Sequence, residues 1–452
     1  MRQKSENIFQ FGLFENENAL PKIVRKYRAE YREINDILAK TPKIVGLAHK
    51  DFETLGKSTA GRISSFSSES LLRALIVKQK EGLDYREACI RISESEFLQD
   101  FCMFSRKNSI DYTLLCKSFC AISPQTWELI NQSLANQSIK NESIKVDVIR
   151  TDSTVVETNI HWPTDSSLLW DVYRVIDRIF GKIREIDSAT VPFRFHHKKL
   201  KNLHIFVTRY ASSKSKKRQR QVNGKMKKLI NRVETAVTKV SIFLDVVTRS
   251  TEMIPLIEEL KKLMPSMNKV VSCAHRRWVN GEKVPVEDKV FSIFEPHTEL
   301  IKRGRRDKPV EFGHKIVLNQ SKEKFITGYQ VLEHKLDDSA LLESVIEQHE
   351  DQFGKKPTGL VADRGFCPDN DTLAELCDEI EFLEIPRCNR DFADAILSSA
   401  QQFRAGIEGS ISCLKRASRL SRCFFKGFRN FSSAVGSAIF CHNLMVLSRK
   451  LG

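Results

Sequence analysis

Residues 146–154 read VDVIRTDST and carry the pattern of a β-strand that ends in a polar site. Over residues 145–157, β-branched side chains alternate with polar ones, which is the period of a half-buried strand. This strand leads to Asp152. A second acid, Asp363, follows the short apolar run at residues 360–362. We therefore expect two carboxylates at strand ends, where they can meet at one point of a sheet.

A third acid, Glu408, lies in a basic segment that is expected to be helical. At about 100° per residue, Arg404 and Glu408 are roughly 40° apart around the helix axis, and Glu408 and Lys415 are roughly 20° apart. One narrow stripe therefore carries an acid between two cations. If the three acids meet, their repulsion must be offset by protonation of one acid or by divalent cations, and hard oxygen ligands suit Mg²⁺ or Mn²⁺. Two such ions can clamp the attacking and leaving oxygens of a phosphoryl transfer.

The elements in the C-terminal part of the chain have the pattern of a mixed sheet. We expect a hairpin from residues 312–318 and 325–332, a helix at 337–352, a strand at 358–362, a helix at 370–379, a strand at 382–385 and a long helical segment from about 403 to 447. A mainly helical stretch from about residue 170 to 263 separates the first strand from the hairpin. The expected fold is α/β, with a ribonuclease-H-like mixed sheet interrupted by a large helical insert after the first strand, plus an N-terminal all-helical domain.

The N-terminal part is expected to be helical. Residues 22–40 place apolar and aromatic side chains on one helical face. Residues 66–122 predict short helices joined by tight turns, capped at Ser67 or Ser68 and at Asp84. Such a unit suits a helix-turn-helix that places one helix in the major groove of DNA. A plain helical bundle without a DNA role fits the same pattern, so both interpretations stay open.

The charge of the chain is strongly positive and regionally concentrated. The 452 residues are 41% hydrophobic and carry a formal net charge of +16, which allows two or three domains with real cores and favours a polyanionic partner. Residues 189–233 contain no acid and interleave aromatic with basic side chains. A charge run is often only a solvated face, but this length and composition favour contact with a nucleic-acid backbone. The residues expected to bind DNA there include Lys216, Lys217, Arg218 and Arg220.

The sequence has few signals of other protein classes. No apolar run approaches the roughly 18–20 residues that span a bilayer, and the N-terminus has no signal-peptide core, so we expect no membrane partner and a cytoplasmic, nucleoid-associated location. The 11 cysteines are scattered without paired C-x-x-C spacing. This distribution predicts reduced thiols rather than a zinc site or a disulfide framework.

Three motifs, in order, resemble those of bacterial insertion-sequence transposases of the DDE class. Residues 151–166, TDSTVVETNIHWPTDS, match the family's first-aspartate motif, a strand with DST followed by a PTDS turn. Residues 362–366, ADRGF, match its second-aspartate motif. Arg404, Glu408 and Lys415 match, at R-x3-E-x6-K spacing, the Y-R-E-K signature around the catalytic glutamate. These motifs imply a ribonuclease-H-like catalytic core.

The resemblance also implies a reaction and its partners. Asp152, Asp363 and Glu408 would be the catalytic metal ligands, holding two Mg²⁺ or Mn²⁺ ions, and Arg404 and Lys415 would hold DNA phosphates. The implied reaction is hydrolysis at the ends of a mobile element, which frees a 3′-hydroxyl that then attacks target DNA. The implied partner is double-stranded DNA, both terminal inverted repeats and target. Pairing of two ends is compatible with a homodimer, but the sequence contains no heptad pattern that demonstrates one.

The chain departs from the family's pattern at two points. Gln401 stands where the signature has its tyrosine. The large insert follows the first aspartate, whereas that of the best-studied relatives precedes the glutamate, so their hairpin-processing chemistry is not implied. The domains expected are a helical, DNA-end-binding domain at 1–140, the first part of the catalytic core at 141–165, a basic, mainly helical insert at 166–300 and the second part of the core at 301–452.

Two other functions stay open beside this interpretation. A catalytically silent DNA-binding repressor or repurposed transposase, and a resolvase- or repair-type nuclease, fit similar sequence features. Glu157 lies five residues after Asp152, on the opposite face of the strand, and is expected to be structural. Asp165 is expected to cap a helix and His314 to pack in the interior.

Overall fold

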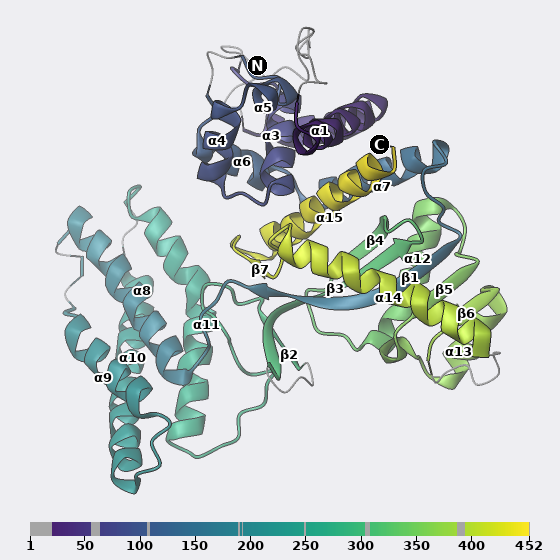
Figure 1. Ribbon diagram of the computed structural model, residues 1–452. Coiled ribbons are helices and arrows are strands. Elements are labelled where there is room, and N and C mark those ends of the chain that lie inside the picture. Colours follow the sequence, from purple (N-terminus) through teal and green to yellow (C-terminus); the bar gives the residue numbers. More distant parts are fainter. Residues whose placement is uncertain are drawn as a thin grey trace. The chain divides into compact units, whose positions relative to one another are not determined.

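The computed structural model describes residues 20–55, 64–105, 109–188, 190–191, 193–247, 250–302, 308–386 and 394–451. The chain divides into two compact units (Figure 1). The first consists of Met1–Thr158 and His314–Gly452, and the second of Asn159–Gly313. The insert expected at 166–300 therefore lies inside the second unit.

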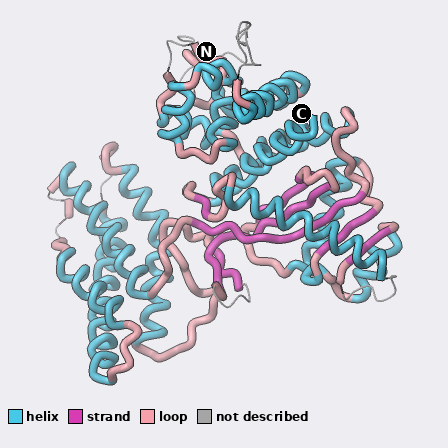
Figure 2. The backbone as a smooth tube through the Cα atoms, in the orientation of Figure 1, coloured by secondary structure: helices cyan, strands magenta, loops and turns pink. Residues whose placement is uncertain are grey.

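The first unit is built on a mixed sheet (Figure 2). Strand β5 (Gly359–Ala362) runs parallel to β1 (Val148–Thr158), and β6 (Phe382–Glu384) runs parallel to β5. On the other side of β1 lies β3 (Val310–Ser321), which forms an antiparallel hairpin with β4 (Ile326–Val331). The order β4-β3-β1-β5-β6 confirms the expected mixed sheet, the hairpin and the strands near 360 and 383.

Helices cover both faces of this sheet. Alternate residues of β1 point to opposite faces, so Ile149 packs in one core and Val156 in another. The core around Ile149 includes α12 (Leu342–Phe353) and α13 (Asn370–Glu379), preceded by the short 3₁₀ helices η2 (Asp338–Leu341) and η3 (Arg364–Phe366). The core around Val156 includes α14 (Asp394–Arg416) and α15 (Phe428–Leu451). Asp152 and Val156 share the α14 face because both are even-numbered positions of the strand.

The expectation of one long helical segment from about residue 403 to 447 is wrong. The segment is two helices, α14 and α15, separated by the two-residue strand β7 (Arg422–Cys423), which pairs in parallel with the end of β1. Arg419 and Gly427 have positive φ angles of 53° and 78°, a conformation that an α-helix does not allow. The helical periodicity on either side of the break hides it in the sequence.

Seven helices precede the sheet among the described residues. Helix α15 contacts α1, α3 and α7, and their apolar side chains share one core with the α14 face of the sheet. Ser67 caps α3, and Asp84 forms a capping box with Glu87 at α4, which confirms both expected caps. The helices are α1 (Lys22–Lys40), α2 (Pro42–Glu53), α3 (Ser68–Lys80), α4 (Tyr85–Glu94), α5 (Glu96–Phe101), α6 (Tyr112–Ala121) and α7 (Pro124–Lys140).

Helix α15 is strongly apolar because it is buried inside the protein. Its segment Phe428–Arg449 is long and apolar enough to cross a membrane, which the expectation from apolar runs did not include. This window is 94% buried inside the protein. Its apolar character is that of a core helix surrounded by other helices and the sheet.

The second unit is a helical bundle with its own core. Its helices are α8 (Asp165–Ile186), α9 (His197–Tyr210), α10 (Lys216–Val246) and α11 (Ile254–Trp278), which confirms the mainly helical insert. Side chains from all four helices form one apolar cluster. A short strand, β2 (Glu299–Lys302), pairs antiparallel with the first residues of β3.

Candidate active site

The register of β1 and β5 brings the first two acids to the same level. Thr151 pairs with Ala362, and the next residues along the two parallel strands are Asp152 and Asp363. Neighbouring strands lie about 4.8 Å apart, and side chains at the same level of parallel strands point to the same face. Asp152 and Asp363 therefore face the same side of the sheet, next to α14.

Helix α14 supplies the third acid on this face. Its inward stripe, Phe403, Ile407, Ser410 and Leu414, has helical spacing, and Ile407 and Leu414 are buried. Glu408 is on the flank of this stripe, and 63% of its side chain is exposed.

Arg404 lies between Glu408 and Asp363. Nη2 of Arg404 is 3.7 Å from Oε1 of Glu408, and Nη1 is 3.9 Å from Oδ1 of Asp363. Both separations are at the long end for an ion pair, and half or more of each carboxylate side chain is exposed. Such pairs are weak, so either acid can exchange its guanidinium partner for a stronger cation.

The pKa of the Asp152 carboxyl reflects its burial and its charged neighbours. Burial raises its pKa to about 6, and the negative charges of Asp363 and Glu408 add to the increase. The backbone N–H of Ser153, which donates to Oδ1 at 2.7 Å, and the charge of Arg404 act in the opposite direction. The carboxyl group of Asp152 thus senses the charges of Asp363, Arg404 and Glu408, and its own negative charge is under-compensated.

The donor set fits a hard divalent cation in its chemistry. All three donors are carboxylates, which Mg²⁺ and Mn²⁺ prefer, and excess negative charge surrounds Asp152. In the side-chain positions of the described residues, no three His, Cys, Asp or Glu groups are close enough to hold an ion. A metal site here requires the exposed side chains of Asp363 and Glu408 to turn toward Asp152. Rotation of exposed side chains is fast and needs no change of the fold.

The other expected DNA-binding residues lie on two helices. Lys415 is on α14 and partly buried, whereas Gln401, at the position of the family's tyrosine, is exposed. In the second unit, the first turn of α10 contains basic residues and no acid. Lys216, Lys217 and Arg220 are exposed there, and the Arg218 guanidinium lies 4.4 Å from the ring centre of Tyr210.

The aromatic residues among these cations have a structural role. Phe193, Phe195, Phe206 and Tyr210 pack against the core of the helical bundle. All four are partly buried, and this packing does not test the expectation that the basic run follows a nucleic-acid backbone. The exposed lysines and arginines between them are unaffected by this finding.

Glu157, Asp165 and His314 have the following partners. Glu157 is structural as expected, because its Oε2 accepts a hydrogen bond from Nη2 of Arg422 at 2.9 Å across the β1–β7 pair. Asp165 is not the helix cap: Thr164 caps α8, and Asp165 instead accepts hydrogen bonds from Arg277 and Trp278. His314 is buried and packs against Phe428 and Phe431, as expected.

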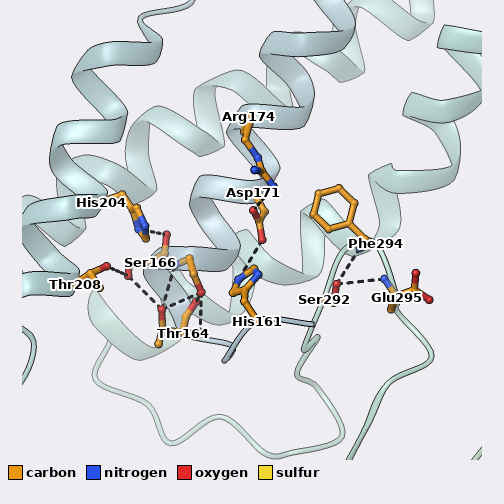
Figure 3. A network of polar contacts seen from close by, with 11 residues as sticks. His161, Thr164, Ser166, Asp171, Arg174, His204, Thr208, Ser292, Phe294 and Glu295 are labelled. Carbon is orange, nitrogen blue, oxygen red and sulfur yellow. Dashed lines mark hydrogen bonds and ion pairs between the residues drawn. The ribbon is translucent and has the colours of Figure 1, made fainter. Parts of the chain in front are cut away.

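A polar network in the second unit ties its helices together (Figure 3). Asp171 is buried and accepts a hydrogen bond from Nη2 of Arg174 at 2.9 Å, and its Oδ2 lies 3.3 Å from Nε2 of His161. Nδ1 of His204 on α9 is 3.1 Å from the carbonyl oxygen of Ser166 on α8. These contacts fasten the segment after β1 and helix α9 to α8, which is a stabilising role.

Sequence reasoning missed three features near the site. Arg150 on β1 and Glu384 on β6 are both buried and face the α14 side of the sheet. Each is paired in register with Val361 of β5, the strand that lies between them. In the sequence, these two residues could have been found as charged residues within the mostly apolar runs VDVIR and FLEI. Cys367, four residues after Asp363, is in a disulfide, so the expectation of reduced thiols is wrong for this residue.

Comparison of the chain with protein-family models, with curated proteins and with solved structures finds no match.

Proposed function

We propose that this protein is a DDE transposase of a bacterial insertion sequence, with a ribonuclease-H-like catalytic core. The observation that carries the proposal is the position of the acids. Asp152 and Asp363 are level on adjacent parallel strands, and Asp152 senses the charges of Glu408 and Arg404 on the helix that covers that face. Asp363 directly follows the end of β5, whereas Asp152 lies within β1 and not at its end as expected. Together with Glu408 on a helix, these two acids support the set that the three sequence motifs imply.

The order of the strands supports the ribonuclease-H-like assignment. A hairpin lies on one side of β1, and two parallel strands, reached through helices, lie on the other. The large insert after β1 forms a unit of its own and leaves this order intact. The likeness of strand order, however, is one of architecture, and the function rests on the acids.

The residues have distinct roles in the proposed reaction. Asp152, Asp363 and Glu408 would hold two Mg²⁺ or Mn²⁺ ions, which when bound supply charge stabilisation for an in-line phosphoryl transfer. Arg404 and Lys415 hold phosphates of the DNA backbone beside these acids. The same residues serve hydrolysis at an element end and the later attack of the freed 3′-hydroxyl on target DNA, because only the nucleophile differs.

The second unit supports DNA binding. Basic side chains at the start of a helix are unfavourable within the protein, because the helix dipole is positive there. Lys216, Lys217 and Arg218 begin α10 all the same, with no acid in its first turn. This concentration of positive charge suits a phosphate backbone. Double-stranded DNA, as terminal inverted repeats and as target, is the proposed partner, and a homodimer is the proposed assembly for pairing two ends.

The test is a cleavage and joining assay. DNA flanking the gene is sequenced to find inverted repeats, and duplexes that end in these repeats are incubated with protein, Mg²⁺ and a target plasmid. A transposase nicks at the repeat end and then joins that end to the plasmid, and a chelator abolishes both products. Cleavage without joining would support a resolvase- or repair-type nuclease instead.

One observation favours a second function. Within the described part of the chain, no three potential ligands are close enough to hold a metal ion. A catalytically silent DNA-binding repressor requires no such arrangement. Specific binding to the repeats with no Mg²⁺- or Mn²⁺-dependent cleavage would support this function and refute the transposase.

A further inference from the structure

Arg150 connects the strand of Asp152 to the helix of Glu408. It lies on β1 two residues before Asp152, on the same face, and is 4% exposed. Its Nη1 donates a hydrogen bond of 2.5 Å to the carbonyl oxygen of Phe403, and its guanidinium lies 4.8 Å from the centre of the Phe403 ring. The side chain thus holds α14 at the residue directly before Arg404.

A glycine makes this close approach possible. A Cβ atom added to Gly406 would lie 2.9 Å from Nη2 of Arg150 and closer still to Nη1. Any side chain at this position therefore requires the guanidinium or the helix to move. Gly409, one turn further along the same helix, has no heavy atom within 4 Å of such a Cβ among the described residues, so it provides a matched control.

A second contact holds the helix about two turns further along. Nε of Arg150 donates to Oε1 of Gln320 on β3 at 2.8 Å, and Nε2 of Gln320 is 2.6 Å from Oγ of Ser410. Helix α14 is thus held at Phe403 and at Ser410. Arg404 and Glu408 lie between these two attachment points.

The chemistry of these contacts distinguishes them from ordinary packing. Burying a guanidinium is costly, and an apolar side chain would cover the helix without that cost. Apolar packing tolerates small shifts along the helix axis, whereas a hydrogen bond to one backbone carbonyl and a fit over one glycine allow a single axial position.

We propose that Arg150 is a positioning residue that sets the axial position of α14, so that Arg404 and Glu408 lie opposite Asp152 and Asp363. This inference rests on the proposed function for its catalytic consequence. Its structural consequence is independent of that function: loss of the contact frees the helix backbone around residues 403–410.

The experiment compares Gly406→Ala, Gly409→Ala, Arg150→Met, Arg150→Ala and the double variant Arg150→Ala/Gly406→Ala in the full chain. Three properties are measured: the unfolding temperature, the affinity for repeat DNA without metal, and the rate of nicking as a function of Mg²⁺ concentration. Hydrogen exchange of the backbone amides at 403–410 is followed separately in the protein without metal.

We expect Gly406→Ala and Arg150→Met each to slow nicking by about 100-fold, since a displacement of about 1 Å costs that much. Both should also raise the Mg²⁺ concentration needed for half-maximal nicking, while DNA affinity is kept. Gly409→Ala should behave as wild type. In the Arg150→Ala background, adding Gly406→Ala should cost nothing further, because the clashing guanidinium is gone.

The outcomes separate the inference from the proposed function. Additive effects of the two substitutions, or unchanged exchange at 403–410 in Arg150→Met, would overturn the inference even if wild type nicks normally. If wild type does not nick, the proposed function fails, and faster exchange with non-additive unfolding temperatures would still establish Arg150 as the residue that holds α14. A variant that fails to fold is replaced by Arg150→Lys, which keeps one donor to Phe403 and is expected to show part of each effect.

Discussion

Arg404 lies one helical turn before Glu408, and its Nη2 is 3.7 Å from Oε1 of that acid, while Nη1 is 3.9 Å from Oδ1 of Asp363. One guanidinium thus balances two acids that arrive from different elements. Its own side chain is 23% exposed, which leaves it accessible to a ligand. In the proposed transposase, binding of cations by the acids would free the guanidinium to hold a phosphate group.

Replacement of Arg404 tests this role. Arg404→Ala should reduce nicking about 10²–10³-fold, the loss typical of one group that stabilises transition-state charge. Arg404→Lys should keep part of the rate, because it retains the charge but loses the planar fork. The control is Arg416→Ala, an exposed arginine near the end of the same helix. Equal rates for Arg404→Ala and this control would remove Arg404 from the site.

The three acids should be needed for cleavage but not for binding. Asp152→Asn, Asp363→Asn and Glu408→Gln are each expected to lower nicking by about 10²–10³-fold or more, because each removes a charge that holds the cations. Binding of repeat DNA, measured by gel shift without metal, should stay close to wild type.

The control for this series is Glu157→Gln, which changes an acid of β1 that is already paired with Arg422. It should nick at the wild-type rate and lose no more than about 1 kcal/mol of stability. If any one of the three site variants nicks as fast as this control, that acid does not bind the catalytic cations.

The basic residues at the start of α10 should determine how DNA binding depends on salt. If six to ten phosphates are contacted, affinity falls about 10³–10⁵-fold between 50 and 200 mM salt. Changing Lys216, Lys217 and Arg220 to Gln should weaken binding and reduce the slope of log K against log salt by roughly 0.9 for each lost contact. The control is Lys261→Gln/Lys262→Gln, two exposed lysines of α11. An unchanged slope in the α10 variant would mean that these cations are only solvated.

Glu384 should make stability depend on pH. Its carboxylate is buried, neither oxygen has a hydrogen-bond partner among the described residues, and burial raises its pKa. The folded state therefore keeps the proton more tightly than the unfolded state, so its contribution to stability is present at low pH and is lost as pH rises through the folded pKa.

Glu384→Gln removes this dependence. The variant should unfold at a higher temperature than wild type at pH 8, and the difference should shrink toward pH 5, where the wild-type carboxyl is closer to protonated. Glu381→Gln, at the exposed position directly before β6, should show no such trend. A gain that is independent of pH would mean that the pKa of Glu384 is the same in the folded and unfolded states.

Local patterns in the sequence were sufficient for most elements of this fold. The alternation around Val148 and the short apolar run before Asp363 predicted strands that the structure contains. The sequence also predicted caps at Ser67 or Ser68, of which Ser67 is the cap, and at Asp84. Such signals depend on neighbouring residues and on backbone geometry, so they are legible without a tertiary structure. The break between α14 and α15 was missed because it depends on pairing of β7 with a strand more than 260 residues earlier.

The sequence by itself determined which acids are candidates, but only the tertiary structure decided how they come to lie on one face of the sheet. Asp152 and Asp363 lie at the same level of the sheet because of the register of β1 and β5. The position of Glu408 beside them depends on the fit of Arg150 over Gly406. Both relationships join residues more than 200 positions apart. Strand register and helix docking are set by long-range packing and hydrogen bonds, which no local period of the sequence encodes.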